Sequence, residues 1–202
     1  MRPLRCLLPA LAAPAAATAR SAACAHADGA TTLQSTAQVA VYRSAGSDFG
    51  ARFYACWQPT GRELLLHTNT TGADVTDAIF GQAAIAGRVV AFHVAATGDR
   101  NYDFVRSFDV RSGRRLRRSG IVGRGSRNLP QPAPPSAIAT NSHGAIAWLA
   151  SGILRVTDVR NTRAVATIAP GPITGVRATE RAAHWRQLGR PFHTRFVLGR
   201  RD

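Results

Sequence analysis

Apolar residues recur along the chain in short runs that are rich in Val, Ile, Phe, Tyr and Trp. Clusters of Gly, Asn, Pro and Ser separate these runs, and no helical periodicity is sustained beyond the first 37 residues. The pattern predicts strands over residues 39–42, 53–57, 63–67, 83–86, 89–95, 104–110, 116–118, 137–139, 145–150, 153–159, 164–168, 176–178, 183–185 and 195–198. So many short strands without helices between them indicate an all-β sandwich, barrel or propeller.

Internal repetition narrows this choice. Residues 109–114, Asp-Val-Arg-Ser-Gly-Arg, return as residues 158–163, Asp-Val-Arg-Asn-Thr-Arg, and residues 58–62 are a shorter relative. In each copy a strand ends, a polar pair with Gly or Asn forms a hairpin turn, and an Arg opens the next strand. We expect Asp109 and Asp158, which occupy equivalent positions, to cap their turns through a side-chain oxygen.

A second repeated segment precedes the first. Residues 87–92, Gly-Arg-Val-Val-Ala-Phe, match residues 144–149, Gly-Ala-Ile-Ala-Trp-Leu. Each repeat begins with an apolar strand, a Gly turn and a strand with an aromatic residue. A strand ending in Asp-Val-Arg, a polar turn and a further strand follow. This order resembles one blade of a TolB-like or WD-repeat-like β-propeller, as in uncharacterised secreted propeller-like proteins of high-GC bacteria. Two departures leave the family function untransferred: Asp109-Val110 stands where WD repeats carry Trp-Asp, and residues 141–144 stand where TolB repeats carry an Asp-Gly turn.

The resemblance implies a small, all-β, propeller-like domain of about four units, over residues 38–67, 83–118, 136–168 and 173–198 of a domain that spans 38–202. A closed four-bladed ring is the first expectation, and an open or incomplete arrangement or a twisted sandwich is the alternative. Residues 28–37 are expected to be a flexible lead-in without strands. Residues 68–81 and 119–136 interrupt the repeat and are expected to be loops.

The first 27 residues have the three parts of an export signal. A basic start precedes a 14-residue apolar run, from Cys6 to Ala19, which is too short to span a bilayer. Ala25-His26-Ala27 predicts cleavage before Asp28, and Ala17-Thr18-Ala19 is an earlier alternative exit. The sequence therefore predicts a secreted protein without a transmembrane span, with a lipoprotein anchored at Cys24 as the alternative.

Cysteine use follows from the predicted cleavage after Ala27. Cys6 and Cys24 would leave with the signal, so Cys56 would remain alone and no internal disulfide could form. Because Cys56 lies in an apolar run, we expect it to be a small buried side chain.

The charge of the chain comes from arginine alone. All 26 basic residues are Arg, against 11 Asp and Glu, which gives a formal net charge of +15. Eight arginines crowd residues 106–127, and the candidate binding residues among them are Arg114, Arg115, Arg117 and Arg118. An exported protein would meet anionic wall polymer, polysaccharide or phospholipid head groups with such a stripe. Nucleic acid is not expected, because no aromatic residue for stacking lies between Phe108 and Trp148. A solvated strand edge is the alternative.

No catalytic, cofactor or metal signature is present in the sequence. A Gly-x-Ser-x-Gly motif, a phosphate loop and a dinucleotide fingerprint are all missing, and the histidines His67, His93, His143, His184 and His193 lack metal-ligand spacing. We therefore assign no catalytic residues, no cofactor and no metal. The leading hypothesis is a non-catalytic binding or scaffold module of unknown ligand, with a protein or an anionic extracellular polymer as partner. The alternatives are an electrostatic binder of anionic surfaces and an uncatalogued extracellular hydrolase.

Overall fold

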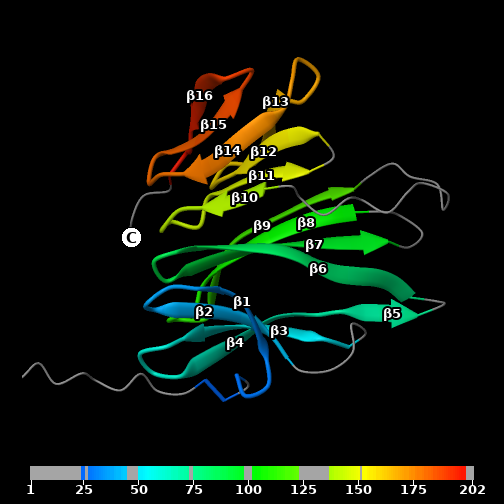
Figure 1. The fold of residues 1–202 in the computed structure, drawn as a ribbon, viewed down its shortest axis with the longest axis vertical. Helices are drawn as coiled ribbons and strands as arrows, with labels where there is room; N and C mark the ends of the chain where they lie inside the picture. The colour runs from blue at the N-terminus through cyan, green and yellow to red at the C-terminus, as the bar shows by residue number, and fades with distance from the viewer. Residues whose placement is uncertain are drawn as a thin grey trace, which may run out of the picture.

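The computed structural model describes residues 24–25, 27–44, 50–72, 75–97, 102–122, 137–150 and 152–198. Strands form four antiparallel sheets, and within each sheet the strands follow chain order (Figure 1). The first sheet holds β1 (Thr31–Ser35), β2 (Val39–Arg43), β3 (Arg52–Trp57) and β4 (Arg62–Thr68). The second holds β5 (Thr70–Gly72), β6 (Val75–Ala86), β7 (Val89–Thr97), β8 (Tyr102–Asp109) and β9 (Arg114–Val122).

The other two sheets come from the C-terminal part of the chain. The third holds β10 (Ala137–Thr140), β11 (Ile146–Ala150), β12 (Ile153–Thr157) and β13 (Thr162–Thr167). The fourth holds β14 (Ile173–Ala178), β15 (Ala182–Gln187) and β16 (Arg190–Arg195). The fold is therefore all-β, and no helix that could cross a bilayer occurs in the described ranges.

The four sheets stack in chain order. Contacts join β1 and β4 to β6, β10 to β6 and β7, and β10 and β11 to β14, so each sheet packs on the next one. The first and fourth sheets lie at opposite ends of the stack (Figure 1). The described residues thus form an open array, and the closed ring that was the first expectation is not what they form. The open arrangement was the alternative.

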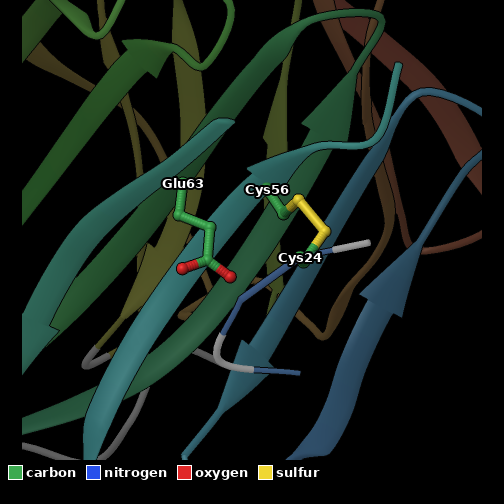
Figure 2. A group of neighbouring side chains, drawn as sticks. All are labelled: Cys24, Cys56 and Glu63. Atoms are coloured by element: carbon green, nitrogen blue, oxygen red, sulfur yellow. A yellow bond between two sulfur atoms is a disulfide. The ribbon is translucent and has the colours of Figure 1, made fainter. Parts of the chain in front are cut away.

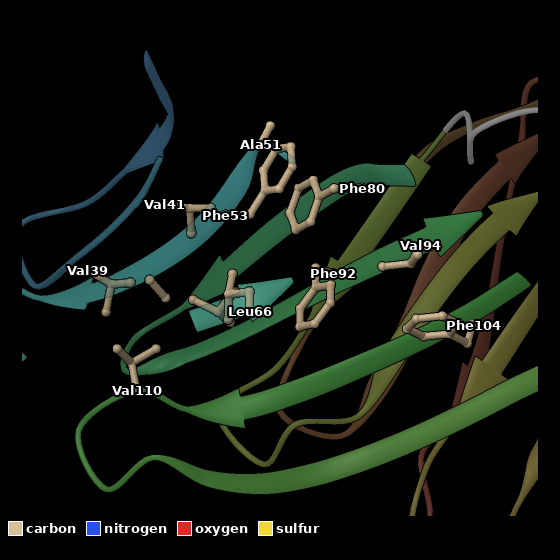
Figure 3. Packing of buried hydrophobic residues seen from close by; sticks show 12 residues of the cluster. Val39, Val41, Ala51, Phe53, Leu66, Phe80, Phe92, Val94, Phe104 and Val110 are labelled. Atoms are coloured by element: carbon tan, nitrogen blue, oxygen red, sulfur yellow. The ribbon is translucent and has the colours of Figure 1, made fainter. Parts of the chain in front are cut away.

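Apolar side chains fill the space between successive sheets. Between the first and second sheets, Phe53 and Phe80 stack with ring centroids 4.2 Å apart, and Phe80 stacks on Phe92 at 5.5 Å (Figure 3). Trp148 of β11 packs with Val105 between the second and third sheets. Inner strands are therefore buried on both faces, as in β11, where all five residues are buried.

Side-chain hydrogen bonds to turn backbones also tie the sheets together. Arg62 at the start of β4 donates from Nη1 to the Arg111 carbonyl at 2.9 Å and from Nη2 to the Ser112 carbonyl at 3.0 Å in the second sheet. Ser107 Oγ donates to the Gly144 carbonyl of the third sheet at 2.7 Å. The arginine that opens a strand after the repeated turn can thus join neighbouring sheets.

Thirteen predicted strands coincide with observed ones in whole or in part, and four regions differ. Residues 28–37 are not a strandless lead-in, because β1 pairs with β2 there. Residues 68–81 carry β5 and the start of β6, and β9 extends to Val122 in the segment expected to be a loop; residues 123–136 lie outside the described residues. The last strand ends at Arg195, where the predicted strand was expected to begin.

Cys56 is buried as expected, but it is not alone. It forms a disulfide with Cys24, whose Cα lies 6.1 Å from its own (Figure 2). Cys24 and Ala30 pack against the outer face of the first sheet, over Tyr42 and Tyr54, which are 2% and 6% exposed. The prediction that no internal disulfide can form is therefore wrong, because Cys24 is held against the folded domain.

The disulfide also bears on the predicted cleavage. A cut after Ala27 would remove Cys24 and uncover the tyrosine pair, whereas a cut at the earlier exit after Ala19 keeps both. Lipidation of Cys24 would use the same sulfur atom as the disulfide, so the lipoprotein alternative and the disulfide are mutually exclusive. Of the two predicted exits, the earlier one would keep the disulfide.

We predict that the Cys24→Ser/Cys56→Ser variant loses about 3 to 4 kcal/mol of unfolding free energy, because the bond closes a loop with a sequence separation of 32 residues. Denaturant unfolding with and without reductant measures this loss. Reductant should destabilise the wild type and leave the double variant unchanged. If reduction frees both thiols and the unfolding free energy of the wild type does not change, the structural role of the disulfide is contradicted.

Candidate anion-binding groove

The predicted arginine run lies on β9, the edge strand of the second sheet. Arg114, Arg115 and Arg118 are exposed, and Arg117 is half-buried. The register between β8 and β9 shifts at Leu116, so that Arg115 stands opposite Phe108 and Arg117 stands opposite Ser107. A single extra residue in the strand therefore divides the run between the two faces of the sheet.

The shift turns Arg117 toward the third sheet. Ser107, its partner, donates to the Gly144 carbonyl there. Leu116 fills the adjoining space so closely that a Cβ at Gly144 would lie 2.7 Å from the Leu116 Cβ. Phe108, in contrast, stacks on Phe92 in the core toward the first sheet.

A groove lies between β9 and the turn that joins β12 to β13. It is lined by residues 116–118 and residues 157–162, which bring Arg117, Arg118 and Arg160 to one place. Asp158 is the only acid in this lining, so the groove carries a net positive charge. Of the four candidate residues, Arg117 and Arg118 line the groove, and Arg114 and Arg115 do not.

Hydroxyl groups close one side of the groove. Thr157 Oγ1 and Thr162 Oγ1 lie 2.9 Å apart, and these two residues form the strand pair next to the β12–β13 turn. Thr162 Oγ1 also donates to Ser119 Oγ of β9. These contacts fix the edge strand of the second sheet against the turn of the third sheet.

Asp158 organises the turn beside the groove. Its Oδ1 accepts from the Arg160 amide at 3.0 Å, and its Oδ2 accepts from Arg163 and from the Val197 amide at 3.0 Å. Burial of this carboxyl raises its pKa, but the hydrogen bonds from Arg163, Val197 and Arg160 outweigh that effect and hold the pKa of Asp158 below its ordinary value. The carboxylate is therefore charged and fully engaged within the protein.

Asp109 has the equivalent role in the second sheet. Its Oδ1 accepts from the Ser112 amide at 3.1 Å, and its Oδ2 lies 2.8 Å from Arg88 Nε. The expectation that both aspartates cap their turns is confirmed. The ion pairs that the two aspartates form are with Arg88 and Arg163, which lie outside β9.

Arg117 has unused hydrogen-bonding capacity. Its Nη1 donates to the Leu116 carbonyl, and its buried Nε has no hydrogen-bond partner among the described residues. Burial lowers the pKa of Arg117, Asp158 opposes this effect, and Arg114 adds to it. The guanidinium keeps its charge at neutral pH, so an anion in the groove would give a buried donor a partner.

The described histidines do not converge on a metal site. His93 packs near Trp148 with ring centroids 6.1 Å apart, His143 Nε2 lies 3.2 Å from a Glu180 oxygen, and His184 lies near His193 at 5.9 Å. The one group of three candidate ligands found among the described residues is Cys24, Cys56 and Glu63, within 4.8 Å of one another (Figure 2). Its two sulfur atoms are bonded to each other, so they are not thiolate ligands.

Comparison with known proteins adds no family to this description, because no protein-family model and no curated protein matches the chain. The site is therefore described by its own geometry.

We predict that Asp158→Asn lowers the unfolding free energy at pH 7 by about 2 kcal/mol, because three charge-assisted hydrogen bonds lose their anion. Since the pKa of Asp158 is lowered by folding, its contribution is present above the unfolded-state value of about 3.9 and is lost as the pH falls through the folded-state value. Urea unfolding at neutral and acid pH should therefore show wild type and variant converging in acid. Asp109→Asn is the matched control, with a smaller loss expected because its Arg88 partner is 53% exposed. Equal stability of Asp158→Asn and wild type at pH 7 would refute the role given to this carboxylate.

Proposed function

We propose that this protein is an exported, non-catalytic binding module of the propeller type, which holds anionic groups in the groove between β9 and the β12–β13 turn. The observation that carries the proposal is the meeting of Arg117, Arg118 and Arg160 in one groove whose single carboxylate, that of Asp158, is already engaged. Arginine forks suit phosphate and carboxylate oxygens. The buried Nε of Arg117 is the donor that a ligand oxygen would satisfy.

Two features support the propeller type. Successive antiparallel sheets of three to five strands stack in chain order, and equivalent turns carry equivalent aspartate caps. Such units mostly display binding surfaces at their turns, and this inference rests on analogy. A scaffold without a ligand remains the second reading of the same architecture.

Export is supported by the disulfide, because disulfides persist in oxidising compartments and are rare in the cytosol. A signal that ends at the Ala17-Thr18-Ala19 exit would leave Cys24 in the mature chain, where the disulfide needs it. Anionic polymers outside the cell are then the ligands within reach, such as wall polymer, polysaccharide or phospholipid head groups.

The test compares two pairs of arginines on the same strand. Arg117→Gln/Arg118→Gln removes the groove pair, and Arg114→Gln/Arg115→Gln removes two charges outside the groove. Retention on a phosphate resin is measured as a function of salt. We expect the groove pair to reduce the slope of log retention against log salt by about 1.5, taking roughly 0.7 to 0.9 per lost contact, and the outer pair to reduce it much less.

Two results would overturn this assignment. Equal losses for both pairs would mean that β9 acts as diffuse charge, which is the electrostatic alternative. If the slopes are unchanged for both pairs and for the variant that replaces all four arginines, the arginine run is a solvated strand edge that binds no anion.

A further inference from the structure

The outer face of the fourth sheet carries a row of positive and protonatable side chains. The register of β14, β15 and β16 places Arg177 opposite His184, and His184 opposite His193. Their neighbours Trp185 and Phe192 stack on each other on the opposite face, where Trp185 packs against the third sheet. Because side chains alternate along a strand, the row faces away from the stack.

Two more arginines share this outer face. Arg186 stands opposite Thr174 and Pro191, and Arg195 stands opposite Ala182. Arg177, Arg186 and Arg195 are all exposed. Neighbouring strands are about 5 Å apart, and residues on one face of a strand recur at about 7 Å. Each strand of the sheet thus contributes one exposed arginine to this face.

Acidic side chains do not balance this face. Glu180 is the only acid between residues 159 and 201. It lies in the β14–β15 turn, where its Oε2 accepts from Ser142 Oγ at 2.6 Å and lies 3.2 Å from His143 Nε2, both in the third sheet. The carboxylate is therefore committed to joining the two sheets.

The register also places two histidines among these arginines, where their protonation adds positive charge to the face. Burial and the charges of Arg177 and His193 lower the pKa of His184, whose Nε2 also lies 3.3 Å from Thr179 Oγ1. An anion lying across this face would favour the charged form of His184.

The two ends of the stack therefore differ. At the first sheet the outer face holds tyrosines and is covered by the segment that Cys24 anchors. At the fourth sheet the outer face is polar and cationic and stands at the far end of the molecule (Figure 1). Among the described residues the fourth sheet's outer face is exposed, and its chemistry suits a solvated, charged partner.

We propose that the outer face of the fourth sheet binds a linear polymer that carries phosphate or carboxylate groups at regular intervals. Charge complementarity over several positions favours a polymer over a single ion. The outer-face positions of β14, β15 and β16 named above hold no Phe, Tyr or Trp on which nucleic-acid bases could stack. They also hold no large apolar side chain that would enter a bilayer. The proposal uses other residues than the groove on β9 and does not depend on it.

The test uses Arg177→Gln/Arg186→Gln, with Arg52→Gln/Arg111→Gln as a matched control that removes the same charge from exposed positions on the first and second sheets. Binding to long-chain inorganic polyphosphate and, in a separate arm, to polygalacturonate is measured by calorimetry over a salt series. We expect the fourth-sheet pair to reduce the slope of log K against log salt by about 1.5 and the control pair to leave it nearly unchanged. The two polymers distinguish a phosphate from a carboxylate preference.

The pH dependence provides a second, independent measurement. His184 faces Arg177 on β14 and His193 on β16, with Arg186 beside it, so a bound polyanion favours its charged form. Affinity should rise as the pH falls from about 7.5 to about 5.5, and His184→Gln should weaken that rise. An equal reduction of the salt slope by the two arginine pairs would overturn the proposal. No binding of either polymer, or binding of oligothymidine or anionic vesicles alone, would overturn it as well. A groove-pair variant that retains the pH dependence would separate this face from the proposed function.

Discussion

Face-to-face packing of successive sheets is the interaction on which the rest of this structure depends. A sheet inside the stack must bury both faces, which explains continuous apolar strands such as β11 and the stack of Phe53, Phe80 and Phe92 between the first two sheets. The same packing leaves two terminal faces without a neighbouring sheet. One is covered by a segment that the Cys24–Cys56 disulfide holds in place, and the other is polar.

The turns give the stack its specificity. Asp109 and Asp158 cap equivalent hairpins, and Arg62 and Arg163 reach from the start of one strand to backbone carbonyls of the next sheet. Arginine thus has two roles in this chain. Some guanidinium groups join sheets and are part of the fold. Arg114, Arg115 and Arg118 of β9 and Arg177, Arg186 and Arg195 of the fourth sheet are exposed, and the half-buried Arg117 lines the groove.

The sequence predicted the fold class, most strands and the aspartate caps, because these depend on local patterns of two to six residues. It missed β1, whose five residues are all exposed and carry no alternating apolar pattern. It also misplaced the last strand. Phe196 belongs to the core and was included in the predicted strand, but β16 ends one residue earlier.

The candidate site was predicted only in part. The arginine run was visible as a local cluster, but the extra residue at Leu116 that divides it, and the distant turn that completes the groove, depend on tertiary packing. The disulfide was missed because the favoured cleavage position removed Cys24 from consideration. The row of Arg177, His184 and His193 is spread over three strands, so only the register brings it together.

The accessible cations of this stack are concentrated at particular places, while other arginines are structural. Since every basic residue is an arginine, the side-chain Nε–Hε spectrum of ¹⁵N-labelled protein observes the cations directly. During titration with polyphosphate, we expect the signals of Arg177, Arg186 and Arg195 to shift with those of the groove arginines, while the signals of Arg62 and Arg163 remain unchanged. A uniform shift of all exposed arginines, or no shift in the fourth sheet, would contradict this expectation.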